Sequence, residues 1–354
     1  MTGRQRLLHA LNNKEPDTVP ISECLYSRPL YKEVLGYVPE VFDVEAVFEC
    51  CEKIGYDFAF IPVLGVAGFR PAGEKREIYQ DEWGITYKLD AHAWPIDGPI
   101  QAPLKDGNDW KNYTMPDASE DWRYKGLKNV IQRSRENGMG VLGNVRGPYS
   151  ASWLLFSMQE FSMLFYEEPE TIDSVLTALT EFAIVSFGKM AEAGVDALVI
   201  SDDYGSTQAP LFSPDHFRRF IRPHIVRMVE AANKLSLPLV LHSDGHVAPL
   251  MDDCVSAGIH GWHPVERAAG MDLKATKDKY GNKLCLFGNV DSKVVLTKGS
   301  AEDVAAQVKE CIEIAAPGGG YCLMSDHSVH EEIPNSNVFA LYEAGRRYGR
   351  YPHK

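Results

Sequence analysis

The sequence predicts an α/β fold, a single (β/α)8 TIM barrel over residues 1–354. Eight short apolar segments alternate with segments of helical periodicity, and eight parallel strands are the number that closes such a barrel. Neither G-x-G-x-x-G nor G-x-x-x-x-G-K-[ST] follows any of the eight segments, so nucleotide-binding folds lack motif support. A doubly wound open sheet remains the alternative.

The N-terminal half supplies the first three strands. A helix is expected over 2–12, where Leu7, Leu8 and Leu11 share a face, and a strand over 18–22. The next helix, 43–54, carries an apolar stripe from Val44 to Ile54 and is followed by Gly55, a residue typical just after a helix end. The second strand is expected over 57–63, a helix over 121–137 and the third strand over 138–147.

The C-terminal half continues the alternation. A long helical stretch is expected over 150–193 with a break at 168–169, followed by helices over 217–235, 301–315 and 336–348. The remaining strands are expected over 195–200, 238–245, 259–266, 284–291 and 320–328. Each is short and apolar, as expected of parallel strands covered on both faces.

The rhythm breaks between residues 64 and 137. The segment 81–87 is typical of a hairpin strand, and 94–100 is rich in turn residues. Because long excursions between core strands are often functional loops, we predict that 64–137 forms an insertion, or lid, over the C-terminal mouth of the barrel.

Charge and composition limit the function classes. The formal net charge is −13, which argues against nucleic acid or an anionic membrane as a partner. We expect no membrane span and no signal peptide, because no apolar run of about 18 residues is evident and the first residues lack an apolar core. The seven cysteines are scattered without a C-x-x-C pair, which favours a cytoplasmic protein with reduced thiols; Cys322 is expected to pack in the core.

Polar side chains follow most of the predicted strands. In a TIM barrel the active site lies at these carboxyl ends, so a site is a better explanation than coincidence for the set as a whole. For single residues such as Asp202, Asp203 and Asp291, helix capping remains an alternative. The strand exits carry Glu23, Cys24, Asn144, Arg146, Asp202, Asp203, Tyr204, His242, Asp244, His263, Glu266, Asn289, Asp291, Asp326 and His327.

Three of these residues could hold a metal. His242 and Asp244 are two apart, so in an extended chain they point the same way, and His327 follows the eighth strand. Together they would offer two nitrogens and one oxygen and leave a fourth position open, as in zinc sites. Acid–base use of the same residues without metal is the alternative. Because Asp202 and Asp203 are adjacent, we expect one carboxylate to face the mouth and the other to serve the scaffold.

The chain resembles the uroporphyrinogen decarboxylase superfamily nearly end to end. The resemblance rests on DEWG at 81–84, DDYGSTQ at 202–208, SPDHF at 213–217, HSDG at 242–245, GNVD at 288–291 and GGGY at 318–321 through His327. After the first strand only Arg28 stands where the decarboxylase has an arginine-rich substrate loop, which argues against a porphyrinogen substrate.

The second branch that the chain resembles comprises the corrinoid-dependent methyltransferases. Their His-x-Cys and later Cys ligands correspond here to His242, Asp244 and His327, which fits a donor such as a methyl ether better than a thiol. The resemblance implies methyl transfer between a small methyl donor and a corrinoid protein, with zinc as the metal and a homodimer as one expected assembly. The expected catalytic residues are Asp202, Asp203, Asn144 and His263, and the expected substrate-binding residues are Tyr204, Gln208, Arg146 and Asn289.

Two other functions remain open at this stage. One is a metal-free decarboxylase of a smaller carboxylate substrate, with an aspartate or histidine as proton donor. The other is a module that binds a corrinoid protein without chemistry of its own.

Overall fold

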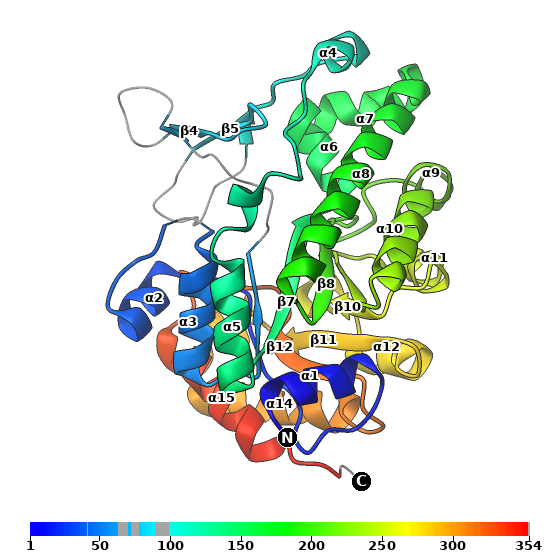
Figure 1. Ribbon diagram of the computed structural model, residues 1–354. Coiled ribbons are helices and arrows are strands. Elements are labelled where there is room, and N and C mark those ends of the chain that lie inside the picture. The colour runs from blue at the N-terminus through cyan, green and yellow to red at the C-terminus, as the bar shows by residue number, and fades with distance from the viewer. Residues whose placement is uncertain (41, 63–69, 72–77, 89–98, 353–354) are drawn as a thin grey trace.

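The centre of the fold is a seven-stranded parallel sheet surrounded by helices (Figure 1). The computed structural model describes residues 1–40, 42–62, 70–71, 78–88 and 99–352. The strand order is β12-β11-β10-β9-β8-β7-β2, so the strands of this sheet follow one another in chain order, with β3 to β6 inserted between β2 and β7. The strands are β2 (Phe58–Phe60), β7 (Gly140–Arg146), β8 (Ala197–Ser201), β9 (Leu239–His242), β10 (Gly261–His263), β11 (Cys285–Val290) and β12 (Tyr321–Ser325). The predicted α/β class with a parallel sheet is confirmed.

The predicted first strand, 18–22, does not form a regular ladder. Ile21 makes an isolated parallel bridge to Leu323 of β12, and Ser22 donates its amide to the carbonyl of Leu323. On its other side the same segment meets β2: Asp57 donates its amide to the carbonyl of Ile21, and the Ser22 hydroxyl donates to the carbonyl of Phe58. The segment therefore lies between the two outer strands, β12 and β2, through single contacts.

Helices follow most strands and begin with the capping residues that the sequence offers. In α3 (Val44–Ile54), Asp43 accepts the amides of Glu45 and Ala46, and Gly55 ends the helix in the left-handed conformation, as predicted. The other α-helices are α1 (Gly3–Leu11), α2 (Arg28–Leu35), α4 (Gly107–Asn112), α5 (Leu127–Asn137), α6 (Pro148–Phe156), α7 (Met158–Glu167), α8 (Pro169–Ala193), α9 (Pro214–His216), α10 (Arg222–Lys234), α11 (Met251–Ser256), α12 (Leu273–Tyr280), α13 (Val295–Lys298), α14 (Ala301–Ala315) and α15 (Asn335–Tyr348). Single turns of 3-10 helix are η1 (Asp121–Tyr124), η3 (Ala248–Leu250) and η4 (Arg267–Ala269), and η2 (Phe217–Ile221) is a π-helical turn.

The helical stretch expected over 150–193 is three helices: the predicted break at 168–169 is confirmed, and a second break lies at Ser157. Ser157, with a φ of 73°, separates α6 from α7 and caps α7 with its side chain, and Pro169 begins α8. Contrary to the expectation that no apolar run is long enough, α8 could cross a membrane by its length and composition. Half of its apolar window is buried in this fold, where α8 packs against α6, α10 and β7.

The sheet has an inner face and an outer face. On the inner face, side chains from successive strands pack with Leu7 and Leu11 of α1, among them Phe58, Leu142 and Val240. The outer face packs against the surrounding helices in a larger cluster. The inner face is thus a solid core at the end where the strands begin, which leaves the carboxyl end for polar groups.

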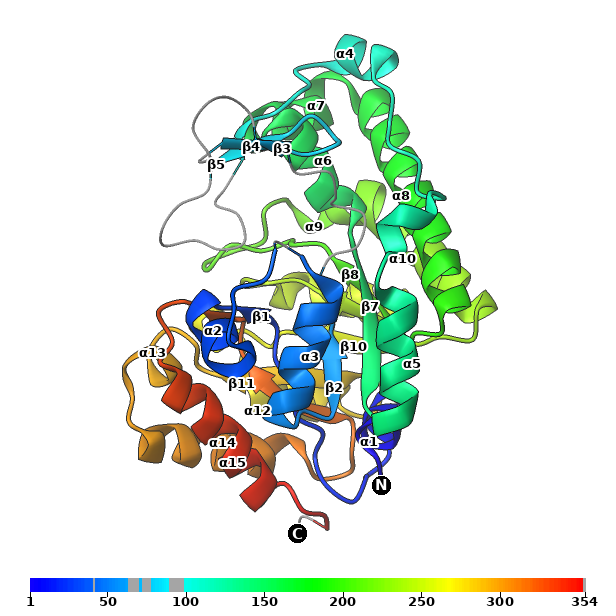
Figure 2. The same cartoon turned by 60° about the vertical axis from the view of Figure 1, so that its left-hand side comes forward.

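A small antiparallel sheet lies toward the other end of the molecule from the termini (Figure 2). It has the order β3-β4-β5-β6, with β3 (Arg70–Pro71), β4 (Ile78–Gln80), β5 (Thr86–Lys88) and β6 (Pro99–Gln101). The segment 81–87, expected as a hairpin strand, is mostly the turn between β4 and β5, and the stretch 94–98 lies outside the described residues. Helix α5, also within 64–137, packs against α3, α8 and β7. A short parallel pair, β1 (Leu25–Tyr26) with β13 (Val329–His330), completes the fold.

Candidate active site at the carboxyl ends of β7 to β10

Four polar residues form one row across neighbouring strands. The sheet register pairs Arg146 of β7 with Ser201 of β8, Ser201 with His242 of β9, and His242 with His263 of β10. Each is the last residue of its strand. Because residues in register on parallel strands point to the same face, these side chains share the inner face with Leu142 and Val240.

Asp203, His242 and Asp244 form a compact cluster beyond this row. Nε2 of His242 lies 3.6 Å from a carboxylate oxygen of Asp203 and 3.6 Å from one of Asp244. One donor atom from each residue lies within 4.8 Å of the other two. In a tetrahedral zinc site with bonds of about 2.1 Å, ligand atoms are about 3.4 Å apart, and the two 3.6 Å distances are close to this value, so the three residues could hold a metal ion.

His327 joins the cluster through Asp244. Its Nε2 lies 3.2 Å from a carboxylate oxygen of Asp244, and its Nδ1 is 2.8 Å from the Ser328 hydroxyl. The Asp244 carboxylate raises the pKa of His327 to about 9. At neutral pH His327 is therefore a protonated partner of Asp244 and lies next to the Asp203–His242–Asp244 cluster.

The neighbouring histidines and carboxylates shift the pKa values of both aspartates in the cluster. Partial burial and the Asp244 carboxylate raise the pKa of Asp203. For Asp244 the opposing effect of burial is outweighed by His327 and His242, which lower its pKa. Oδ1 of Asp244 is buried and has no hydrogen-bond partner among the described residues. A buried carboxylate oxygen without a donor is costly, and a bound cation would satisfy it. The donor set of one imidazole and two carboxylates fits zinc.

His263 lies behind His242 and away from solvent. It is fully buried, and the Nδ1 atoms of the two rings are 2.6 Å apart. Burial, together with His242, lowers the pKa of His263 well below its ordinary value. A neutral His263 can therefore hold the ring of His242 so that Nε2 faces Asp203 and Asp244. This arrangement is typical of residues that orient a metal ligand; a direct catalytic role for His263 stays a prediction.

Asp202 and Asp203 have different surroundings. Asp202 is fully buried and accepts the amides of Tyr149 and Ser150 at the start of α6, as well as the hydroxyl of Tyr204. Burial raises its pKa to about 7. The side chain of Asp203 is 41% exposed and faces His242. Asp202 therefore lies on the scaffold side, where it caps α6, and the catalytic role expected of Asp203 stays a prediction.

The remaining predicted site residues are spread over three environments. Asn144 is buried on β7, where it accepts the Ser201 hydroxyl, and Gln208 is exposed in the loop after β8. Tyr204 is fully buried and packs against Tyr149, Phe212 and Phe217. Asn289 is also buried, donating to the carbonyl of Val265 and accepting from Arg267. Substrate contacts of Tyr204 and Asn289 stay predictions. Because both side chains are buried and already contact protein groups, their surroundings argue against such contacts.

One buried carboxylate was noted in the sequence but given no role. Glu23 is fully buried and accepts the amide and the hydroxyl of Ser325, at the end of β12. Burial raises its pKa to about 8. Its position directly after a predicted strand was visible in the sequence, but its partner 302 residues away was not.

A family model described as uroporphyrinogen decarboxylase (URO-D) matches residues 84–348, which is most of the chain. The chain belongs to the uroporphyrinogen decarboxylase family. The resemblance expected from the sequence is thereby confirmed. The match includes β7 to β12, and with them Asp203, His242, Asp244 and His327.

Relatives within the uroporphyrinogen decarboxylase family carry two kinds of names. A methylcobamide:CoM methyltransferase of Methanosarcina barkeri is 29% identical over 212 residues, covering 59% of this chain and 58% of the relative. A uroporphyrinogen decarboxylase of Syntrophotalea carbinolica is 27% identical over 188 residues, covering 52% of this chain and 51% of the relative. The chain thus aligns with less than two thirds of the length of these relatives.

The fold is shared with a solved structure titled as a methyltransferase from Methanosarcina mazei. The TM-score is 0.75 at 23% identity, covering 98% of this chain and 99% of the other. This likeness shows that the two proteins share the same fold over nearly their whole lengths.

Proposed function

We propose that this protein is a metal-assisted methyltransferase that moves a methyl group between a small methyl donor, such as a methyl ether, and a corrinoid carried by a partner protein. The observation that carries the proposal is the Asp203–His242–Asp244 cluster, which has the spacing and donor types of a metal site at the carboxyl edge of the sheet. Names of relatives that include methylcobamide:CoM methyltransferases support the corrinoid partner.

The residues divide the work between holding and orienting. Asp203, His242 and Asp244 would hold the metal, and His327 would stay next to Asp244. When bound, zinc would supply a Lewis acid for the heteroatom that carries the methyl group. His263 orients His242 from behind, and Asp202 fixes the start of α6 beside Asp203.

Four further expectations belong to the same proposal. We propose that residues 20–22 act as the eighth strand and close the sheet into a (β/α)8 barrel, because they hydrogen bond to both outer strands. In the proposed single domain 1–354, the small sheet β3-β4-β5-β6 of the predicted insertion covers the mouth where substrate and corrinoid meet, whereas α5, within the same predicted range, packs against α3, α8 and β7. A cytoplasmic location and a homodimer complete the expectation.

The test is methyl transfer to a free corrinoid. Purified protein is incubated with zinc, reduced cobalamin and a series of methyl ethers, and methylcobalamin is followed by its absorbance. We expect methylcobalamin to form with at least one donor and to require the metal. The variant His242→Ala should lose the activity, and His216→Ala, which removes an imidazole from α9 outside the site, should keep it.

The competing function is a metal-free decarboxylase, which is favoured by the relatives named uroporphyrinogen decarboxylase. It predicts carbon dioxide release from a small carboxylate that persists after chelation of metal. The corrinoid-binding module predicts complex formation with a corrinoid protein but no turnover with any donor. Carbon dioxide release without methylcobalamin formation would replace the methyltransferase proposal.

A further inference from the structure

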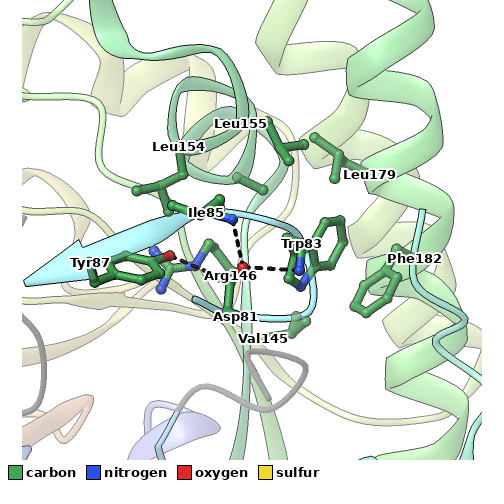
Figure 3. A pocket seen from close by; sticks show the side chains of 11 residues that line it. Asp81, Trp83, Ile85, Tyr87, Val145, Arg146, Leu154, Leu155, Leu179 and Phe182 are labelled. Atoms are coloured by element: carbon green, nitrogen blue, oxygen red, sulfur yellow. Dashed lines mark hydrogen bonds between the residues drawn. The ribbon is translucent and has the colours of Figure 1, made fainter. Parts of the chain in front are cut away.

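A narrow cavity opens beside the last residues of β7 (Figure 3). Its walls are mostly apolar: Trp83 and Ile85 come from the turn between β4 and β5, Leu154 from α6 and Phe182 from α8. The cavity measures about 20 Å³, enough for about one water-sized group. Arg146, at the end of β7, puts a permanent positive charge into this apolar surrounding.

The guanidinium of Arg146 has no hydrogen-bond or salt-bridge partner within the part of the chain that the structure describes, and its Nε is buried. The nearest acidic wall residue is Asp81, beside Arg146 and Tyr87 in Figure 3. Asp81 is hydrogen bonded within its own turn: Oδ1 accepts the amides of Trp83 and Ile85, Oδ2 accepts the Tyr87 hydroxyl, and among the described residues neither oxygen accepts a hydrogen bond from Arg146. Asp81 thus shapes the turn that forms the wall and leaves the guanidinium donors of Arg146 unused.

Arg146 also lies on the same face of the sheet as His242 of the Asp203–His242–Asp244 cluster. It shares a row and a face with His242, two strands away, which is a separation of about 10 Å between backbones. The phenol of Tyr26 lies within electrostatic range of both Arg146 and Asp244. Its pKa is raised mainly by burial, is lowered by Arg146 and is raised by Asp244. One small molecule could therefore touch both the arginine and the cluster.

We infer that Arg146 binds the anionic group of the substrate, so that the methyl donor is a small organic carboxylate whose apolar, methyl-bearing part extends toward the Asp203–His242–Asp244 cluster. A carboxylate is the chemical complement of an unpaired guanidinium, whose donors it can accept two at a time. The apolar walls exclude water and strengthen that pairing. This inference rests on the proposed function for the identity of the reacting methyl group, but not for the binding itself.

The test measures binding by calorimetry on the full chain, with methoxyacetate and 4-methoxybenzoate each compared with its neutral amide. We expect at least one carboxylate to bind at millimolar concentration or below and to bind at least about 10-fold more tightly than its amide, since a hydrogen bond to a charged group is worth about this factor or more. In Arg146→Gln the preference should disappear, and in Arg146→Lys it should be partly kept. Arg218→Gln, the same change at an exposed arginine paired with Asp253, should bind like the wild type.

Melting temperature and metal content are measured on every variant, so that a misfolded Arg146→Gln is recognised and Arg146→Lys decides in its place. The inference is overturned if no carboxylate of the panel binds, if acids and amides bind equally, or if the carboxylate preference survives in Arg146→Gln or, where that variant misfolds, is unchanged in Arg146→Lys. Because the readout is binding, it separates from the proposed function: a carboxylate that binds but gives no methylcobalamin leaves the anion site in place and removes the methyl transfer.

Discussion

At the scale of single residues, Asp202 and Asp203 are adjacent in sequence but differ in their surroundings. Asp202 accepts three hydrogen bonds in a buried site, so Asp202→Asn should lower the free energy of unfolding by about 1–3 kcal/mol, measured by denaturant titration. Asp203→Asn should leave stability nearly unchanged but weaken metal binding at least about 10-fold, because it removes a charged ligand of the cluster. The reverse pattern would mean that the two carboxylates have been assigned the wrong way round.

The raised pKa of Glu23 should make the free energy of unfolding depend on pH. Its pKa is raised from 4.5 to about 8 in the folded protein, chiefly by burial. Between these values the folded state keeps a proton that the unfolded state has lost, so unfolding releases a proton and stability falls as pH rises, by up to about 1.4 kcal/mol per pH unit. Below about pH 4.5 both states are protonated and the contribution is constant.

Glu23→Gln should flatten that dependence between pH 5 and pH 8, because glutamine keeps an acceptor and a donor for Ser325 without titrating. Unfolding midpoints in urea across this range, for the wild type and the variant, give the measurement. Parallel pH profiles for the two proteins would show that Glu23 is ionised in the folded state.

At the scale of elements, the turn from β7 to α6 is built around Gly147. A Cβ atom at Gly147 would lie 2.2 Å from Asp202, which caps α6 from the neighbouring strand exit. Gly147→Ala should therefore push Asp202 aside and destabilise the protein by about 1–3 kcal/mol, with a lower melting temperature.

The matched control is Gly188→Ala in α8. A Cβ atom there meets nothing within 4 Å, and alanine favours a helix over glycine by up to about 1 kcal/mol. This variant should be as stable as the wild type or more so. Equal melting temperatures for the two alanine variants would contradict the close packing at the turn.

The elements also show what local sequence can specify. Helix α14 was predicted with its observed bounds, because the apolar stripe and the capping Ser300 lie within a single segment. Residues 18–22 were predicted as a strand from the same kind of pattern, yet they form only an isolated bridge to β12 and a few hydrogen bonds at the start of β2. Their partners are distant in sequence, so the pairing is a tertiary property that a local apolar pattern does not contain.

At the scale of the whole molecule, the sequence identified the edge of the sheet where polar groups gather but not the partners of each residue. His242 and Asp244 were assigned from their spacing, and both lie in the cluster. Asp203 was expected to be catalytic rather than a ligand, because its distance to His242 depends on how β8 and β9 are aligned. Tyr204 was expected to contact substrate, but its ring packs against Tyr149 of α6 and Phe212 of the loop after β8. This arrangement is set by tertiary packing.

The unpaired guanidinium of Arg146 could not be predicted for the same reason. The sequence shows an arginine at the end of a strand, but not that Asp81, in the described part of the chain, makes its hydrogen bonds within its own turn and none to Arg146. Whether a charge is paired or free follows from tertiary contacts, and those contacts carry the inference on the substrate.

The central claim is that Asp203, His242 and Asp244 hold one metal ion, and metal analysis of the purified protein tests it most directly. After dialysis against zinc and removal of free metal, we expect about one zinc ion per chain in the wild type and in His216→Ala. His242→Ala should retain far less than one, with a folded circular dichroism spectrum. A wild-type protein that binds no divalent metal, or a His242→Ala variant that retains a full equivalent, would contradict the account.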